Sequence, residues 1–282
     1  MSAELPPLRD VIARYALGAK KSLGQHFLLD LNLTRKIARA AEVAPGDRVL
    51  EIGPGPGGLT RALLEAGAIV VAIERDRRCL AALAELQVAF PGRLEIVDGD
   101  ALSADERLLV AAPVKIVANL PYNISTELLI KWLRANHQGA PLWSSMALMF
   151  QREVADRILA APGSKTYGRL SVIAQAASRP ARAFDLPARA FTPPPKVEST
   201  VLLFSPSLTR LAGITALERV TQAAFGQRRK MLRSSLKSLW GDDVEARLAA
   251  AGIRPTDRAE DVSVQKFLEL AEAGAGQAVR PS

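Results

Sequence analysis

The stretch VLEIGPGPGGLTRALLEAGAIVVAIE, residues 49–74, decides the fold of this chain. It begins with a short apolar run typical of a buried strand, passes through a glycine-rich loop and ends in a second apolar run over residues 68–74. Between the two runs, leucines follow helical spacing over residues 59–64, and Gly67 is placed to end the helix. The stretch therefore predicts two strands joined by a helix.

The same alternation continues along the chain. A helical pattern follows over residues 75–92, and Asp30 is placed to cap an earlier helix over residues 31–44. Further apolar runs, bounded by glycine, proline or polar residues, predict strands over residues 93–100, 114–119 and 144–150. Because these runs lack polar alternation, we expect an α/β fold with a parallel sheet covered by helices on both faces.

The character of the chain changes near residue 207. Upstream, residues 181–206 predict two strands that flank a proline-rich bend. Downstream, short helical patterns follow one another, over residues 214–225, 228–240, 243–252 and 262–274. We therefore expect two domains, a sheet-containing domain over residues 1–207 and a small all-α domain over residues 208–282.

The composition constrains the class of protein. The 282 residues carry a net charge of +8, with a pI near 9.9, which favours a polyanionic partner such as nucleic acid. Cys79 is the only cysteine, so no intramolecular disulfide can form. No apolar run approaches the roughly 20 residues that cross a bilayer, and residues 1–15 lack the pattern of a signal peptide. We expect a cytoplasmic protein that does not bind membranes.

The glycine-rich loop is placed to bind a ligand at the start of a helix. Gly53, Gly55 and Gly58 fit the G-x-G-x-x-G pattern of dinucleotide-binding loops, whereas Gly53, Gly55 and Gly57 fit the G-x-G-x-G loop of S-adenosylmethionine enzymes. Glu74, at the end of the second strand, is expected to bind ribose hydroxyls with either ligand. The glycines alone therefore leave two ligand classes open.

Charge favours one of the two ligands. Glu51 lies two residues before the first glycine of the loop, and Asp100 follows the third strand at the same sheet edge. Such carboxylates repel a pyrophosphate, whereas S-adenosylmethionine carries a sulfonium and an ammonium against one carboxylate. Asp100 is also suited to accept from an adenine amine, or to cap the turn that follows it. We predict an S-adenosylmethionine site.

Six segments, in their order along the chain, resemble the motifs of the ribosomal RNA adenine dimethyltransferases, most closely those of the bacterial enzymes that act on the small subunit. They are KKSLGQHFLLD (20–30), LEIGPGPGGLT (50–60), Glu74, DGDAL (98–102), NLPYNIST (119–126) and FTPPPKVEST (191–200). The resemblance implies a Rossmann-like methyltransferase sheet with a small all-α C-terminal domain. It also implies dimethylation of N6 on two adjacent adenosines near the 3′ end of small-subunit RNA, late in subunit assembly.

The NLPY segment has the chemistry that this reaction needs. The lone pair of an adenine N6 is delocalised into the ring, so the amine is a poor nucleophile. The amide oxygen of Asn119 and the backbone carbonyl of Leu120 or Pro121 can accept from the amine and expose its lone pair, and Asn119 also borders the cofactor. The ring of Tyr122, rather than its hydroxyl, is expected to stack on a base taken out of its RNA context. No metal ion is required.

The resemblance assigns roles to two further segments. The segment over residues 20–30 corresponds to the one that closes over the methionine end of the cofactor, with His26 and Leu28 as the matching contacts. The family often has asparagine where this chain has His26. Phe191, beside the proline run, corresponds to the residue that holds the target base against Tyr122; as an alternative, its ring belongs to the core under a proline bend.

Basic residues predict an RNA-binding surface on the helical domain. Arg229, Arg233 and Lys237 follow the spacing of one helix face, which predicts a continuous basic stripe. The full predicted set is Lys20, Lys21, Arg228, Arg229, Lys230, Arg233 and Lys237. A solvated helix face is the alternative. We expect the partner to be ribosomal RNA within a pre-assembled small subunit, bound by a monomer.

Three other functions compete with this one. A large-subunit RNA adenine methyltransferase shares the cofactor loop and an NLPY-like motif. A non-catalytic RNA-binding assembly factor or a transcription factor could share the fold, although the intact Glu51, Gly53, Glu74, Asp100 and Asn119 favour an enzyme. A nicotinamide dehydrogenase fits the glycine loop but neither the acidic residues beside it nor NLPY.

Overall fold

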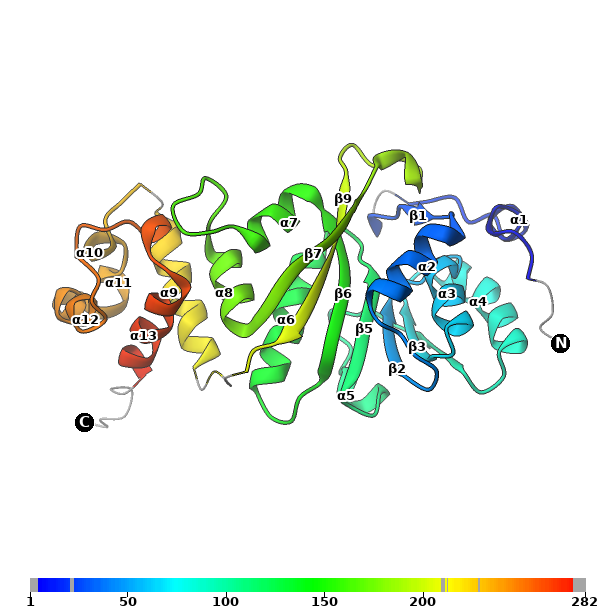
Figure 1. The fold of residues 1–282 in the computed structure, drawn as a ribbon, viewed down its shortest axis with the longest axis horizontal. Helices are drawn as coiled ribbons and strands as arrows, with labels where there is room; N and C mark the ends of the chain where they lie inside the picture. The colour runs from blue at the N-terminus through cyan, green and yellow to red at the C-terminus, as the bar shows by residue number, and fades with distance from the viewer. Residues whose placement is uncertain (1–4, 21–22, 209–210, 212, 228, 276–282) are drawn as a thin grey trace. The chain divides into compact units, whose positions relative to one another are not determined.

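The structure is a computed structural model (Figure 1). It describes residues 5–275 apart from 21–22, 209–210, 212 and 228. These residues form a seven-stranded sheet in the order β4-β3-β2-β5-β6-β9-β7. The strands are β2 (Arg48–Ile52), β3 (Ile69–Glu74), β4 (Leu94–Asp98), β5 (Val114–Asn119), β6 (Trp143–Gln151), β7 (Ser178–Leu186) and β9 (Ser199–Pro206). The predicted strands are therefore confirmed, with their ends shifted by up to three residues.

The strand order places a crevice at the carboxyl ends of the parallel strands. Strands β4, β3, β2, β5 and β6 are parallel neighbours, and β9 pairs with β6 antiparallel. From β2 the chain builds outward to β3 and β4 on one side, and then returns to place β5 and β6 on the other. The order reverses between β2 and β5, where the loops after these strands diverge and ligands bind in open α/β sheets.

Helices connect the parallel strands and are positioned by local signals. Asp30 and Asp76 each accept a hydrogen bond from the first turn of the helix that follows, and Gly67, with a φ of 93°, follows the last residues of α3. Helix α4 contacts β3 and β4, α6 contacts β6, and α2 packs on α3. The helices are α1 (Leu8–Arg14), α2 (Leu31–Ala40), α3 (Gly58–Glu65), α4 (Arg77–Ala89), α5 (Glu106–Leu109) and α6 (Ser125–His137).

A small second sheet joins two distant parts of the chain. Strand β1 (Phe27–Leu28) pairs antiparallel with β8 (Phe191–Thr192), which follows the short helix η2 (Ala188–Ala190). The pairing places Phe27 opposite Thr192 and Leu28 opposite Phe191. It therefore connects the LGQHFL segment to the start of the FTPPPKV segment.

The chain forms two compact units, residues 1–155 with 181–205 and residues 156–180 with 206–282. The second unit thus includes residues 156–180, which the sequence analysis assigned to the first domain. In its interior the Phe225 ring contacts Tyr167 and Phe267, and the Tyr167 hydroxyl donates to the Val262 carbonyl. Its helices, with α7 at the boundary, are α7 (Arg152–Leu159), α8 (Arg169–Ala177), α9 (Ile214–Gly226), α10 (Leu232–Ser235), α11 (Lys237–Trp240), η3 (Gly241–Asp243), α12 (Val244–Ala250), η4 (Ala259–Asp261) and α13 (Val264–Ala275).

The helix predicted over residues 228–240 is wrong. Met231 has an extended backbone that bridges Arg258, so α10 begins only at Leu232, and Leu236 separates α10 from α11. Arg229 lies in a turn before α10. Consequently its side chain does not share a helix face with those on α10 and α11, and the continuous basic stripe is not formed.

No helix within the described parts of the chain is long and apolar enough to cross a membrane.

Candidate active site

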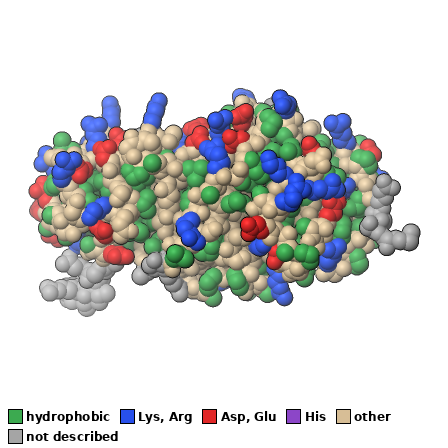
Figure 2. Space-filling view, in the orientation of Figure 1, with side chains coloured by type: hydrophobic (Ala, Val, Ile, Leu, Met, Phe, Trp, Pro, Cys, Tyr) green, Lys and Arg blue, Asp and Glu red, His purple; other side chains and the backbone are tan. Residues whose placement is uncertain are grey.

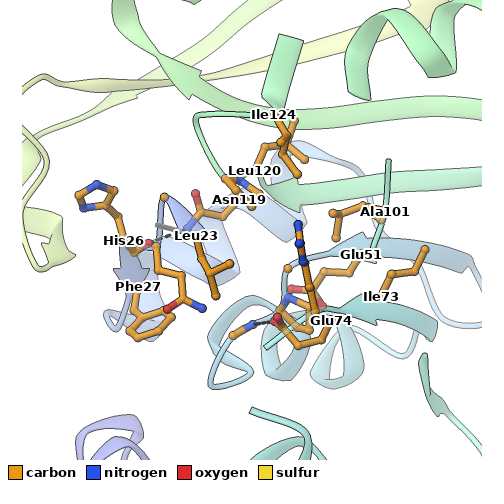
Figure 3. Close-up of a pocket in the computed structure, with 18 of the residues that line it drawn as sticks. Leu23, His26, Phe27, Glu51, Ile73, Glu74, Ala101, Asn119, Leu120 and Ile124 are labelled. Carbon is orange, nitrogen blue, oxygen red and sulfur yellow. Dashed lines mark hydrogen bonds between the residues drawn. The ribbon is translucent and has the colours of Figure 1, made fainter. Parts of the chain in front are cut away.

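A pocket opens where the loops after β2, β3 and β5 meet (Figure 3). With its open mouth it holds about 1040 Å³ of space between atoms. Most of the predicted site residues line it, namely His26, Leu28, Glu51, Gly53, Gly55, Glu74, Asp100, Asn119, Leu120, Pro121 and Tyr122. Sequence reasoning missed other lining residues, among them Leu23, Phe27, Ile73, Arg75, Ala101 and Ile124.

The glycine loop owes its shape to conformations that other residues rarely adopt. Gly53, Gly55 and Gly57 have φ values of 64°, 56° and 86°. A side chain at Gly55 would begin 3.0 Å from the Phe27 ring, which closes that side of the pocket. Gly57 itself does not line the pocket, whereas Gly58 does. Gly57 instead shapes the start of α3, where it is the N-cap residue in a left-handed conformation, and its contact with a ligand stays a prediction.

Glu74 is held rigidly at the end of β3. Its carboxylate accepts hydrogen bonds from the backbone N–H groups of Gly55, at 2.9 Å, and Asp76, at 2.7 Å. Burial raises the pKa of Glu74, and these two hydrogen bonds oppose the rise. Each carboxylate oxygen has a second lone pair, so the group can still accept from a ligand. The position suits the ribose-binding role that was predicted for it.

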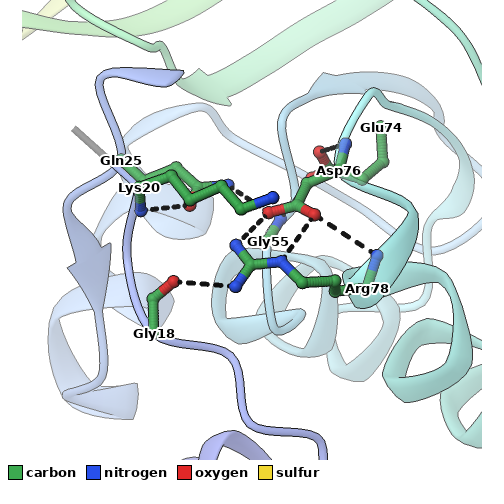
Figure 4. A network of polar contacts seen from close by, with 7 residues as sticks. All are labelled: Gly18, Lys20, Gln25, Gly55, Glu74, Asp76 and Arg78. Carbon is green, nitrogen blue, oxygen red and sulfur yellow. Dashed lines mark hydrogen bonds and ion pairs between the residues drawn. The ribbon is translucent and has the colours of Figure 1, made fainter. Parts of the chain in front are cut away.

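A polar network that the sequence analysis missed surrounds Glu74 (Figure 4). The Asp76 carboxylate accepts from the guanidinium of Arg78, at 2.5 and 2.9 Å, and from the amide of Gln25, at 3.0 Å. Arg78 also donates to the carbonyl of Gly18, at 3.1 Å. The hydrogen bonds from Arg78 lower the pKa of Asp76 to about 2. The network thus ties the chain before β1 to the loop that follows β3.

Glu51 is a buried acid without a counter-charge. Its side chain is 1% exposed, and among the described residues Oε2 has no hydrogen-bond partner. Burial raises the pKa of Glu51 to about 8, and the nearby Glu74 carboxylate adds to the rise. Near pH 7, in the absence of a cation, Glu51 is therefore neutral.

Asp100 has the turn-capping role that was considered for it, and its contact with an adenine amine stays a prediction. Its Oδ1 accepts from the Leu102 N–H at 3.0 Å and so caps a turn, while its Oδ2 lies 3.0 Å from the guanidinium of Arg75. Lys131 of α6 donates hydrogen bonds to the carbonyls of Ala101 and Ala104 and thereby holds this turn in place. The carboxylate still borders the pocket.

Asn119 and the residues after it form the other end of the pocket. The amide nitrogen of Asn119 donates to the His26 carbonyl at 3.1 Å, which leaves the amide oxygen without a hydrogen bond from any described residue. The Pro121 carbonyl already accepts from the Ile124 N–H, so the Leu120 carbonyl is the better remaining acceptor. Two acceptor oxygens are therefore presented by consecutive residues.

Tyr122 and His26 are packed together. Their rings are stacked with centroids 5.3 Å apart, and Nδ1 of His26 lies 2.8 Å from the Pro193 carbonyl. Because a carbonyl only accepts, Nδ1 of His26 carries the hydrogen. Burial raises the pKa of the Tyr122 phenol, so this group stays neutral near pH 7. The His26 ring contacts Tyr122 and Pro193 at the same end of the pocket as NLPY.

Phe191 is not brought to the pocket. Its side chain is 2% exposed and belongs to the core of the first unit, as does Leu28, its partner across the β1–β8 pair. This is the core position that the sequence analysis considered as the alternative. The predicted contact of Phe191 with the target base is therefore not supported by its place in the structure.

The predicted RNA-binding residues are exposed where they can be described. Lys20, Arg229, Lys230, Arg233 and Lys237 are exposed, and the last two lie 4.0 Å from Glu245 and Asp242. Lys21 and Arg228 lie outside the described residues. Figure 2 shows lysine and arginine side chains over both units, with acidic side chains among them. Among the described residues, no cluster of three or more His, Cys, Asp or Glu could hold a metal ion.

The sheet order, the glycine loop and the acid at the end of β3 define a Rossmann-like methyltransferase fold. The sequence profile of the family described as "Ribosomal RNA adenine dimethylase" matches residues 16–275. The chain belongs to this family.

Relatives cover almost the whole chain. A protein of Mesorhizobium japonicum named "Ribosomal RNA small subunit methyltransferase A" is 60% identical over 274 residues, which are 94% of this chain and 97% of the relative. A protein of the same name from Xanthobacter autotrophicus is 57% identical and covers 98% of both chains.

Solved structures of two methyltransferases share the fold. A dimethyladenosine transferase from Plasmodium falciparum superposes with a TM-score of 0.73 at 25% identity, covering 87% of this chain and 96% of the other. The 23S rRNA methyltransferase ErmE superposes with a TM-score of 0.66 at 27% identity, covering 88% and 98%.

Proposed function

We propose that this chain transfers methyl groups from S-adenosylmethionine to N6 of two adjacent adenosines near the 3′ end of small-subunit ribosomal RNA. The observation that carries the proposal is the fixed orientation of the Asn119 amide. Because its nitrogen is committed to the His26 carbonyl, its oxygen is the atom left to accept from an exocyclic amine. Together with the Leu120 carbonyl, it would draw the amine toward a tetrahedral geometry and expose the lone pair.

The residues of the pocket fit the proposed cofactor. S-adenosylmethionine supplies a methyl group activated by a sulfonium. Glu74 would accept from the ribose hydroxyls and Asp100 from the adenine amine, at neighbouring strand ends. The unpaired Oε2 of Glu51 would face a cationic ligand, which stabilises the ionised form of the carboxyl. The residues near Asn119 would then hold the methionine end, and the proximity of the two substrates would supply most of the rate enhancement.

Tyr122 would stack on the target adenine. Such a contact contributes about 1–3 kcal/mol per base by alanine substitution. The exposed basic residues Lys20, Arg229, Lys230, Arg233 and Lys237 would contact RNA phosphates. The substrate would be RNA within a pre-assembled small subunit, bound by a monomer in the cytoplasm.

The identities of the relatives favour the small subunit over the large one as the target. The relatives named for the small subunit are 57–60% identical to this chain, whereas the 23S rRNA methyltransferase ErmE is 27% identical. A non-catalytic role is disfavoured because the predicted acids and the NLPY segment line one pocket.

The proposal is tested by mapping methylated nucleotides. The protein and its Asn119→Ala variant are incubated with S-adenosylmethionine and small subunits that lack the modification, and large subunits serve as the competing substrate. We expect N6-dimethyladenosine at two adjacent positions near the 3′ end of small-subunit RNA, formed roughly 100-fold more slowly with the variant. Methylation confined to large-subunit RNA, or binding of NAD in place of S-adenosylmethionine, would contradict the proposal.

A further inference from the structure

The hydroxyl of Tyr122 is hydrogen-bonded to Ser199, a residue outside the proposed cofactor site. It lies 2.5 Å from the hydroxyl of Ser199, and either oxygen can be the donor. Ser199 is 0% exposed and is the first residue of β9. The two residues are 77 positions apart in the sequence, so no local pattern predicts their contact.

The backbone of Ser199 is held in place by strand pairing within the first unit. It lies opposite Gln151 in the antiparallel pair of β6 and β9, and the chain reaches it from the proline run that contains Pro193. Ladder pairing fixes the backbone of Ser199, because a shift of register would turn the side chain to the other face of the sheet, and burial limits the space in which its oxygen can move. A group bonded to this oxygen is therefore held relative to the sheet.

The bond fixes the direction of the tyrosine ring axis, which packing against one face leaves loose. The phenol oxygen lies on the axis of the second side-chain torsion, so its hydrogen bond limits the swing of that axis. Rotation of the ring about the axis has a broad minimum and is limited by ring stacking instead. In Tyr122 the His26 ring contacts one face, and the hydroxyl at the far end is held by Ser199. Two contacts of different kinds thus define the plane of the ring.

We propose that Ser199 is a positioning residue that fixes the axis of the Tyr122 ring for stacking on the target adenine. The inference rests on the proposed function and deepens it. It also revises the expectation from sequence that the ring alone matters, because the phenol hydroxyl is needed to hold the ring. An adenine stacked on a tilted ring would present its amine off the line to the methyl group, which slows transfer more than it weakens RNA binding.

The test is a double-mutant cycle on the full-length protein with Ser199→Ala, Tyr122→Phe and the combined variant. Single-turnover methyl transfer is measured on unmodified small subunits at saturating S-adenosylmethionine, beside the affinities for cofactor and RNA. Each single variant should lower the rate by roughly three- to tenfold, the effect of one hydrogen bond, with both affinities nearly unchanged. The combined variant should be no slower than either single variant.

Two controls separate positioning from stability. Ser178→Ala removes another buried serine hydroxyl, which donates to the Ala174 carbonyl at 2.6 Å, and it should leave the rate unchanged. If Ser199→Ala fails to fold, Tyr122→Phe carries the test, because it removes the same bond from the other side.

The outcomes distinguish this inference from the function on which it rests. A parent rate in Tyr122→Phe, or losses that multiply in the combined variant, would overturn the role of Ser199 while leaving the methyl transfer intact. Absence of methyl transfer by the unchanged protein would instead remove the proposed function.

Discussion

Replacing Glu51 by glutamine should change how the stability of the ligand-free protein depends on pH. The folded protein keeps the Glu51 proton up to about pH 8, whereas the unfolded chain releases it near 4.5. Between these values the unfolded state binds fewer protons, so the carboxyl makes the free energy of unfolding fall as the pH rises. At about 1.4 kcal/mol per pH unit, the loss over the whole interval is about 5 kcal/mol.

Glutamine has nearly the same shape and does not titrate, so the difference between the two proteins isolates this one group. As the pH rises from 5.5 to 8, the free energy of unfolding of the Glu51→Gln variant should increase by about 3 kcal/mol relative to that of the parent. At roughly 2–4 °C per kcal/mol, its melting temperature should rise by about 6–12 °C relative to the parent over that range. Thermal unfolding in a series of buffers measures this, with the exposed Glu95→Gln as the matched control.

The same group should couple cofactor binding to proton release. A cationic ligand beside Oε2 favours the ionised carboxyl, so binding near pH 7 should release up to one proton, which calorimetry in two buffers of different ionisation heat detects. Glu51→Gln should release none and should bind more weakly. Parallel melting curves for the parent and Glu51→Gln across pH 5.5–8 would refute the reasoning, because they would show that Glu51 is not a neutral buried acid.

Three further variants probe the remaining assignments. Glu74→Ala should weaken S-adenosylmethionine binding more than tenfold, or about 1.4 kcal/mol, in calorimetry; near-normal affinity would exclude the ribose contact. Asn119→Ala should slow single-turnover methyl transfer by roughly 100-fold with little change in RNA affinity. If the variant methylates at the rate of the parent, NLPY is only a turn. Replacing Arg229, Arg233 and Lys237 together with alanine should weaken RNA binding and lower the slope of log K against log salt by about 2, with cofactor affinity as the control. An unaltered slope would mean that these side chains are only solvated.

The parts of the fold that the sequence predicted are those with strong local signals. The apolar runs of β2, β3, β5 and β6 are largely buried on both faces, so they stand out without knowledge of their partners. The cap at Asp30 and the stop at Gly67 are likewise properties of a few adjacent residues. Most of the site followed because each loop at the carboxyl ends of parallel strands reaches the same sheet edge.

The features that were missed depend on distant partners. The break at Leu236 follows from pairing near Met231 and Arg258, which competes with a sequence that favours one long helix. The place of Phe191 in the core and the bond between Tyr122 and Ser199 require the register of β8 and β9. No periodicity in a single segment carries that information.

The short pair of β1 and β8 has a consequence for how the protein is made. About 160 residues separate the two strands, so during synthesis at about 5–20 residues per second Phe27 waits roughly 10–30 seconds for Thr192 to emerge. The glycine loop, Glu74 and Asp100 lie within one stretch of the nascent chain and have their partners much earlier. We therefore expect the glycine loop and the two acids to be placed on the ribosome first, and the part of the pocket that β1 closes to be completed last.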